Sequence, residues 1–220
     1  MGTWKRRSAL ANWVARIIGP RLSLFAVVLI ILIIGAAAGA FSVKSLNLSG
    51  YQELSQFVGG LLHHLSVKGP APTYGWHWMA AEDVLKIAGL LWLLGLSVIG
   101  APLIAAVIFL RGFTLGFVFG FLIDDLGIRG AALALAALLP QNLVSIPGVL
   151  LCAVGAIGFS AEIVRTVFGR ARGVTIYHHL RREGNVGLIG CLLLLVGSII
   201  EIFVSPTLTA VAARYLVRGV

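Results

Sequence analysis

Residues 22–41 read LSLFAVVLIILIIGAAAGAF, a run of 20 residues without a charged side chain. A helix needs about 20 mostly apolar residues to cross the roughly 30 Å hydrocarbon core of a bilayer. Long apolar stretches return near Val84, at Gly130 and at Val186, without strand-like alternation of apolar and polar residues. The chain is therefore predicted to be an all-α, polytopic integral membrane protein.

The composition of the whole chain agrees with this prediction. Of its 220 residues, 59% are hydrophobic and 11% are charged, and the mean hydropathy is +1.01. These values exclude a soluble globular domain. The formal net charge is +9, but ten of the 17 basic side chains lie in residues 1–21 and 162–185. Because basic segments stay in the cytoplasm, insertion topology explains most of this charge, and no nucleic-acid partner is expected.

We predict five membrane-spanning helices. The first is residues 22–41; a cleavable signal peptide is the alternative, because small residues follow the apolar run, but the length of the run favours an anchor. Residues 1–21 are assigned to a cytoplasmic interfacial helix, 42–83 to an exterior amphipathic loop and 84–220 to a helical bundle.

Pro102 divides the second apolar stretch. Either one long kinked helix continues past it, or the chain turns at residues 100–102 and a third span runs to Ile123. The second interpretation is preferred because it leaves no under-length span. It places Arg111 inside the membrane, at a cost of about 2.5–3.5 kcal/mol unless the charge is paired or hydrated. The short exterior loop that follows carries Asp124, Asp125 and Arg129.

Residues 130–161 are apolar but too long for one straight crossing. Pro140-Gln141-Asn142 and Pro147-Gly148 interrupt them, so a discontinuous helix is predicted, buried against other helices or lining a wet cavity. Residues 186–204 form the fifth span. A sixth crossing by the C-terminal tail is the alternative.

Two segments outside the bilayer have the apolar spacing of amphipathic helices. One is 1–21, whose basic residues would hold it on the inner leaflet, unless it is only a topogenic flank. The other is 51–65, which lies on the outer leaflet or docks a partner. Tryptophans before the second span mark the membrane interface. The candidate partner-binding residues are Tyr51, Leu54, Phe57, Val58, Leu61, Trp76 and Trp78.

No catalytic, cofactor or metal site is predicted. His63, His64 and His77 share the exterior loop, but no cysteine or carboxylate cluster completes a metal site. Cys152 and Cys191 lie inside spans as small packing groups, and no disulfide between them is expected. The motifs of metalloproteases, serine hydrolases and phosphate-binding loops are missing, so the protein is not expected to be an enzyme.

Gly112, Gly116 and Gly120 repeat every four residues and give a smooth helix face for packing or for a homo-oligomer. Gly35 and Gly39 do the same on a smaller scale.

Four polar residues are expected within the spans: Arg111, Gln141, Asn142 and Glu201. Either of Arg111 and Glu201 could be paired structurally, which is preferred, or could mark a conduction path. The proline break resembles the unwound ion sites of transporters, so a small transporter or permease-like subunit is the alternative function.

Four segments carry a resemblance to a known family. They are residues 91–102 (LWLLGLSVIGAP), 109–120 (FLRGFTLGFVFG), 138–143 (LLPQNL, with Ile146-Pro147 after it) and 198–206 (SIIEIFVSP). Together they resemble the stage II sporulation protein M family, over most of the chain from Leu22 onward. The broader family often has Pro-His-Gly and a following Glu at the helix break. Here Gln141-Asn142 follow the proline and Ser145 stands in place of the acid, which favours the sporulation branch.

The resemblance implies a non-enzymatic, multi-pass protein of the cell membrane, located at the sporulation septum and engulfing membrane. It implies a scaffold for the peptidoglycan remodelling that drives forespore engulfment. The implied partners are stage II sporulation proteins D and P, a lytic transglycosylase and an amidase/endopeptidase, on the exterior side. No catalytic or ligand-binding residue carries over. The residues agree, because smooth glycine faces and an amphipathic exterior loop suit a scaffold in the lipid bilayer.

Overall fold

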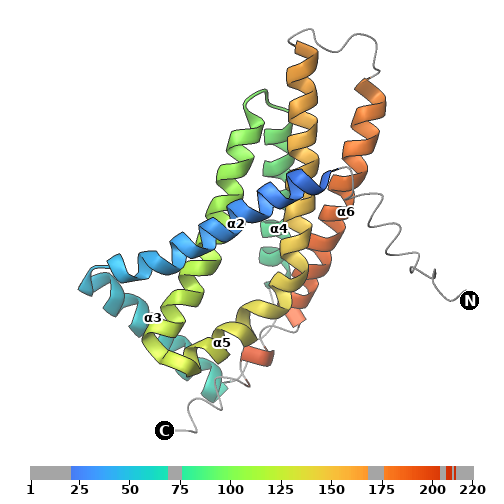
Figure 1. Ribbon diagram of the computed structural model, residues 1–220. Helices are drawn as coiled ribbons and strands as arrows, with labels where there is room; N and C mark the ends of the chain where they lie inside the picture. Colours follow the sequence, from blue (N-terminus) through green and yellow to red (C-terminus); the bar gives the residue numbers. More distant parts are fainter. Residues whose placement is uncertain (1–20, 69–75, 168–175, 204–206, 210, 212–220) are drawn as a thin grey trace, which may run out of the picture.

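A computed structural model describes residues 21–68, 76–167, 176–203, 207–209 and 211, of which 64–68, 76–85, 165, 167, 176–183 and 201–203 are described as backbone only. The described part is all-helical, with the elements α2 (Leu22–Ser42), η2 (Val43–Ser45), α3 (Leu48–Lys68), α4 (Trp76–Gly95), α5 (Gly100–Val167) and α6 (Ile176–Phe203) (Figure 1). The helix predicted in residues 1–21 lies outside the described residues, apart from Arg21.

The chain turns before the third apolar stretch, as predicted, but at residues 96–99 and not at residues 100–102. Helix α4 ends at Gly95 and α5 begins at Gly100, so Pro102 lies in the first turn of α5. A proline is tolerated there because the first N–H groups of a helix have no partner within the helix.

Helix α5 folds back on itself at Gly127. This residue has φ 60° and ψ −137°, a conformation that favours glycine because it has no β-carbon. The bend falls within the predicted exterior loop and divides α5 into a first half (100–126) and a second half (128–167). Leu122 of the first half packs against Leu133 and Ala134 of the second half. The two halves therefore form a helical hairpin.

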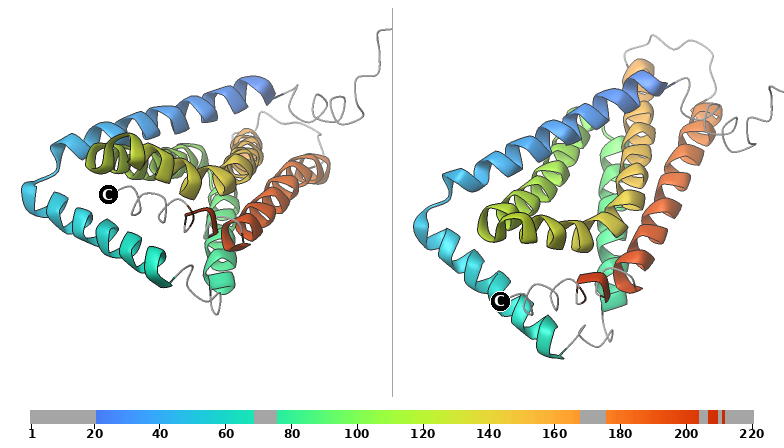
Figure 2. Two further views of the ribbon diagram at one scale, coloured as in Figure 1. Left: turned by 90° about the horizontal axis from the view of Figure 1, so that it is seen from below. Right: turned by 60° about the horizontal axis from the view of Figure 1, so that its bottom comes forward.

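The predicted discontinuity at Pro140-Gln141-Asn142 is wrong. Pro140 and Pro147 lie inside the helix, and Gly127 is where α5 has non-helical dihedral angles. The Asn142 side-chain amide donates a hydrogen bond to the Leu138 carbonyl at 2.7 Å, adding a bond to the turn in which Pro140 has no N–H to donate. Figure 2 shows that the second half of α5 changes direction in this region without unwinding.

The helices share one central core. Its buried residues come from α2, α4, both halves of α5, and α6, and they include Val28, Leu91, Ile104, Ile108, Leu150 and Leu194. Seen from below, α2 and α3 meet at one corner and enclose the α5 hairpin between them (Figure 2). The core therefore fixes the bundle, while α3 lies at its edge.

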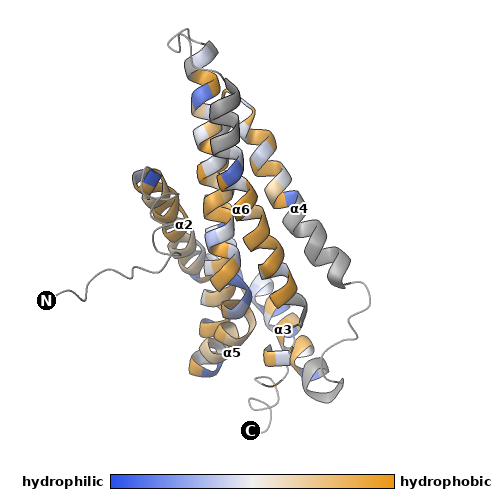
Figure 3. Cartoon of the chain, turned by 90° about the vertical axis from the view of Figure 1, so that its right-hand side faces the viewer, coloured by the Kyte–Doolittle hydropathy of each residue, from blue (hydrophilic) through white to orange (hydrophobic). Residues whose placement is uncertain are grey.

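The outer surface of the bundle is strongly apolar. Large apolar side chains of α2 and α6 are exposed, among them Ile30, Ile33, Ile34, Leu188, Leu192 and Ile199. Figure 3 shows the same apolar character along much of α5 and α6. Among the described residues, Leu22–Ser45 and Gly100–Val164 are long and apolar enough to span a membrane, and Lys86–Gly95 and Gly184–Ile200 are shorter apolar helices. A surface of this kind is suited to lipid.

Candidate functional site

Helices α2 and α5 touch backbone to backbone along two rows of glycines. A β-carbon built on Gly35 would lie 3.1 Å from the Phe113 nitrogen, and one built on Gly39 would lie 2.8 Å from the Phe117 nitrogen. Real β-carbons essentially never come closer than 3.0 Å to another heavy atom, and a β-carbon on Gly35 would also overlap the Phe109 carbonyl oxygen, so this row on α2 leaves no space for a larger residue. We call this contact the α2–α5 seam.

The second row of the seam is the glycine repeat singled out in the sequence. A β-carbon on Gly116 would lie 2.7 Å from Ala36 Cα, and one on Gly120 would lie 2.9 Å from Ala40 Cα. Gly112 approaches the carbonyl group of Leu32. The repeat thus packs within the chain, and the small residues let the two backbones meet.

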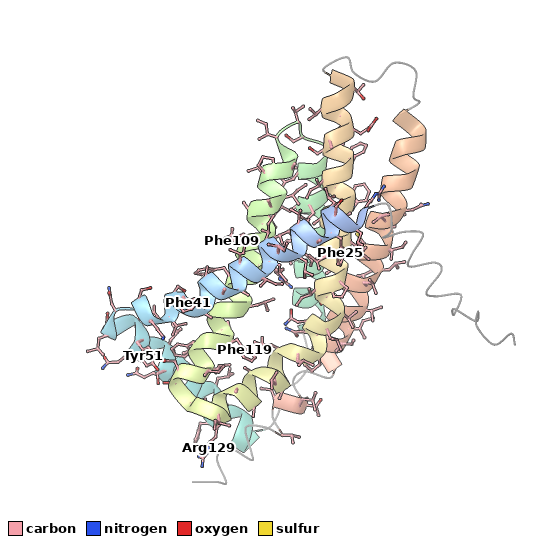
Figure 4. The ribbon with its side chains drawn as sticks, viewed as in Figure 1. Phe25, Phe41, Tyr51, Phe109, Phe119 and Arg129 are labelled. Carbon is pink, nitrogen blue, oxygen red and sulfur yellow. The ribbon has the colours of Figure 1, made fainter. Side chains whose placement is uncertain are left out.

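Phenylalanines flank the α2–α5 seam on α5. The rings of Phe109 and Phe113 lie 6.4 Å apart between centroids, and those of Phe113 and Phe117 lie 6.3 Å apart. Their spacing of four residues puts them on one side of the helix. Figure 4 shows Phe109 where α2 crosses α5. The ring ladder and the glycines therefore alternate along the same crossing.

A second close contact joins the second half of α5 to α6, and we call it the α5–α6 seam. A β-carbon on Gly190 would lie 2.6 Å from Cys152 Sγ and 2.7 Å from the Gly148 oxygen. The two free thiols meet here, with Cys152 Sγ 3.7 Å from Cys191 Sγ. Both cysteines pack as small groups, but the sequence prediction missed that they are neighbours.

A hydrogen bond closes the α4–α5 turn. Ser160 in the second half of α5 is buried and donates its hydroxyl to the Ser97 carbonyl at 2.8 Å. Ser97 lies between the two helices. The bond fixes the turn to the bundle, and sequence reasoning did not assign this role to Ser160.

The predicted intramembrane polar residues lie at different places. Arg111 is half-buried in the first half of α5, directly before Gly112. Gln141 is half-buried and Asn142 is buried in the second half. Glu201 lies in α6, where its side chain is outside the described residues. Structural pairing of Arg111 and of Glu201, each with a group that the sequence does not identify, therefore stays a prediction.

Helix α3 includes residues 51–65, which were predicted to form an amphipathic helix. It packs against the α5 hairpin. The rings of Tyr51 and Phe121 are 5.3 Å apart between centroids. Val58 and Leu62 pack against the cluster of Leu122, Leu133 and Ala134. Figure 4 shows Tyr51 near the lower end of the bundle. We call α3 the arm, because these contacts with the hairpin are made by side chains.

An electrostatic contact joins the arm to the hairpin. Partial desolvation raises the pKa of the Tyr51 phenol above its ordinary value of 10.0, and the nearby carboxylates of Asp125 and Asp124 raise it further. The neutral phenol is therefore the form that this contact favours.

Of the seven candidate partner-binding residues, the five on α3 do not share one exposed side. Tyr51 and Val58 face the hairpin and Leu54 is half-buried, whereas Phe57 is 71% exposed and Leu61 is 47% exposed. Trp76 and Trp78 lie in the first turn of α4, and their side chains are outside the described residues. The sequence pattern joined these residues because apolar spacing does not distinguish a docked side from an exposed one.

One of three comparisons with known proteins identifies a family. The family model described as Stage II sporulation protein M matches residues 28–206, from α2 to the end of α6. The searches of curated proteins and of solved structures each gave no match. Among the described residues, no group of three or more histidine, cysteine, aspartate or glutamate side chains is placed to hold a metal ion. The matched range covers most of the chain, which therefore belongs to the stage II sporulation protein M family.

Proposed function

We propose that the protein is a non-enzymatic membrane scaffold that assembles the peptidoglycan-remodelling complex driving forespore engulfment. Membership of the stage II sporulation protein M family indicates a sporulation-related role, and the apolar helices indicate a membrane protein. The scaffold, its place at the sporulation septum, and its partners, stage II sporulation proteins D and P, are the further steps of the proposal.

Five crossings of the membrane form part of the proposal. The five proposed membrane-spanning helices are α2, α4, the two halves of α5, and α6. The α4–α5 turn and the facing ends of α5 and α6 lie at the upper end in Figure 1, whereas Arg129, just after the bend of the α5 hairpin, lies at the lower end in Figure 4. Residues 162–185 carry five arginines, which favours a cytoplasmic upper end. The lower end, with the arm attached to it, is then exterior.

The observation that carries the proposal is the contrast between the bundle and the arm. The bundle is held by backbone contacts at its glycines, and the arm projects from its exterior end with one side uncovered. Enzymes that degrade the cell wall act on that side of the membrane. A rigid membrane anchor with an exterior helix is suited to holding such enzymes in place.

The transporter alternative has lost its main support. It depended on an unwound helix at Pro140, with free carbonyls that bind an ion. Helix α5 stays helical there, and the Asn142 amide already donates to the Leu138 carbonyl.

Localisation in sporulating cells tests the scaffold. Fluorescent fusions to stage II sporulation proteins D and P are followed in a strain that lacks this chain and in the same strain complemented with it. We expect both fusions to leave the septum in the deletion strain and to return on complementation. Normal septal localisation of both fusions without the chain would contradict the proposal.

A further inference from the structure

The arm has three sides. The docked side faces the hairpin through Tyr51, Val58 and Leu62. At about 100° per residue, Phe57 and Leu61 lie roughly a quarter turn round the helix from the docked side. These two residues form the apolar overhang, which is 71% exposed at Phe57 and 47% exposed at Leu61.

The third side of the arm is polar. It lies roughly opposite the apolar overhang and carries the exposed residues Gln52, Gln56, Gly59 and His63. We call it the polar side. The docked side and the apolar overhang together form one apolar arc on α3. This arc is wider than the contact with the bundle and extends past it on the side of Phe57 and Leu61.

A short, fixed turn holds the start of the arm beside the membrane-facing helix. Five residues join the end of α2 at Ser42 to the start of α3 at Leu48, and these five residues reach about 17 Å at most. The Ser42 hydroxyl donates to the Gly39 carbonyl and the Ser45 hydroxyl to the Ser42 carbonyl, each at 2.7 Å. The arm therefore starts close to the membrane surface.

Exposed apolar side chains flank this turn; at about 100° per residue, Leu48 lies on the side of α3 away from the apolar overhang. Phe41 at the end of α2 is 72% exposed and Leu48 at the start of α3 is 76% exposed. Ile30, Ile33 and Ile34 are also exposed on α2, which is long and apolar enough to span a membrane. Lipid is the partner that covers α2, so lipid lies directly beside the start of the arm.

Among the described side chains of α3, the apolar overhang is small compared with a protein interface. A standard protein interface buries about 800 Å² on each partner, over about 20–30 residues. Two side chains supply a small part of that area. An amphipathic helix, in contrast, binds a bilayer by burying such side chains at the boundary between headgroups and acyl chains.

We propose that the arm lies in the outer-leaflet interface, with Phe57 and Leu61 inserted among the lipids and the polar side facing the exterior. The described part of α3 carries Glu53 as its acidic residue and has no basic cluster. Apolar burial therefore holds the arm on the bilayer, without a need for anionic lipid. That the polar side then meets the wall-degrading partners rests on the proposed function; the lipid contact does not.

Spin labelling of the purified full-length chain in vesicles tests this placement, with no other protein present. Labels are attached to single cysteines in the variants Phe57→Cys and Leu61→Cys, and in the matched controls Gln52→Cys and Gln56→Cys. The wild type is the blank, because Cys152 is buried and Cys191 half-buried between helices. Vesicles contain phosphatidylethanolamine and phosphatidylglycerol, or phosphatidylethanolamine and phosphatidylcholine.

Collision rates with oxygen, which concentrates in lipid, and with a water-soluble nickel chelate are then compared. We expect the ratio of oxygen to nickel collisions to be several-fold higher at positions 57 and 61 than at positions 52 and 56, in both kinds of vesicle. Equal ratios at the four positions, or a high ratio only with phosphatidylglycerol, would overturn the inference. Because no partner protein is present, failure of the scaffold proposal leaves this result unaffected.

Discussion

The α2–α5 seam and the arm are joined by a single short turn, yet they are held by different means. In the seam, glycine backbones lie against backbone atoms of the facing helix, so no side chain separates the two helices. The arm touches the hairpin through side chains, with Tyr51 against Phe121 and with Val58 and Leu62 against one small cluster. A backbone contact has no atom that can turn aside, whereas a side-chain contact can adjust.

This difference separates two tasks along the chain. The glycine seams fix the relative positions of the helices in the bundle, because well-packed interiors resist even small increases in volume. The position of the arm can adjust when α3 contacts lipid or a partner. Substitutions in the seam should therefore lower the stability of the whole bundle, and substitutions in the arm should change only the arm.

The largest effect is expected from Gly116→Ala in the α2–α5 seam. The new β-carbon would lie 2.7 Å from Ala36 Cα, so the helices must separate. We expect a loss of about 3 kcal/mol in the free energy of unfolding, measured by denaturant titration in detergent. The matched control is Gly89→Ala, because a β-carbon there meets no atom within 4 Å. The control should keep or raise stability by up to about 1 kcal/mol, because alanine is the better helix former. Equal stability of the two variants would contradict the claim that close backbone contact in the α2–α5 seam stabilises the bundle.

Gly190→Ala in the α5–α6 seam should have a smaller effect. Its β-carbon would lie 2.6 Å from Cys152 Sγ, a side-chain atom that can turn, and 2.7 Å from the Gly148 oxygen, which cannot. We expect a loss of about 2 kcal/mol in the same titration. Gly184→Ala on the same helix is the control, since its nearest neighbour is a Trp92 ring atom at 3.9 Å. If Gly184→Ala cost as much as Gly190→Ala, close backbone contact would not explain the loss.

Val58→Ala should loosen the arm and leave the bundle intact. The change removes two methyl groups from the contact with Leu122 and Leu133, at a cost of about 1 kcal/mol to docking. Hydrogen exchange measured by mass spectrometry should become faster in α3 and stay unchanged in α5. Gln56→Ala, on the polar side, is the control and should leave both rates unchanged. Faster exchange throughout the bundle would show that the arm is part of the rigid core.

The smallest effect concerns the ionisation of Tyr51. Its pKa is raised by partial desolvation and by Asp125 and Asp124, so the folded chain favours the neutral phenol. The stabilisation from this contact is complete below pH 10.0 and is lost as the pH rises through the raised pKa. Ultraviolet titration should show a late phenol ionisation that Tyr51→Phe removes and Asp125→Asn shifts back toward pH 10.0. If the phenol ionisation that Tyr51→Phe removes has the ordinary pKa of 10.0, the titration would contradict the contact with Asp124 and Asp125.

Much of the fold follows from local properties of the sequence. The uncharged run at 22–41 predicts α2, and Pro102 predicts the turn before α5, because both depend on residues close in the chain. The proline rule failed at Pro140, since the helix stays wound there and Asn142 adds a hydrogen bond. The sequence predicted a loop near Gly127, whereas the structure turns at this one glycine.

The site was less predictable than the fold. The spacing of Gly112, Gly116 and Gly120 indicates a packing face, but which helix it meets depends on how the helices cross. The contact between Cys152 and Cys191 depends on the register of α5 against α6, which no local pattern contains. The docked side and the apolar overhang of the arm share one apolar arc, so only the folded chain separates Val58 from Phe57.

Co-purification from sporulating cells tests the central claim most directly. The tagged full-length chain is solubilised gently, and the proteins bound to it are identified, with Gly89→Ala as the intact control and Gln52→Arg with Gln56→Arg as the polar-side variant. The account predicts that stage II sporulation proteins D and P are recovered with the wild type and the control, and that the polar-side variant recovers less of both. Recovery of neither protein with an intact, folded wild-type chain would contradict a scaffold that holds wall-degrading enzymes on the exterior side.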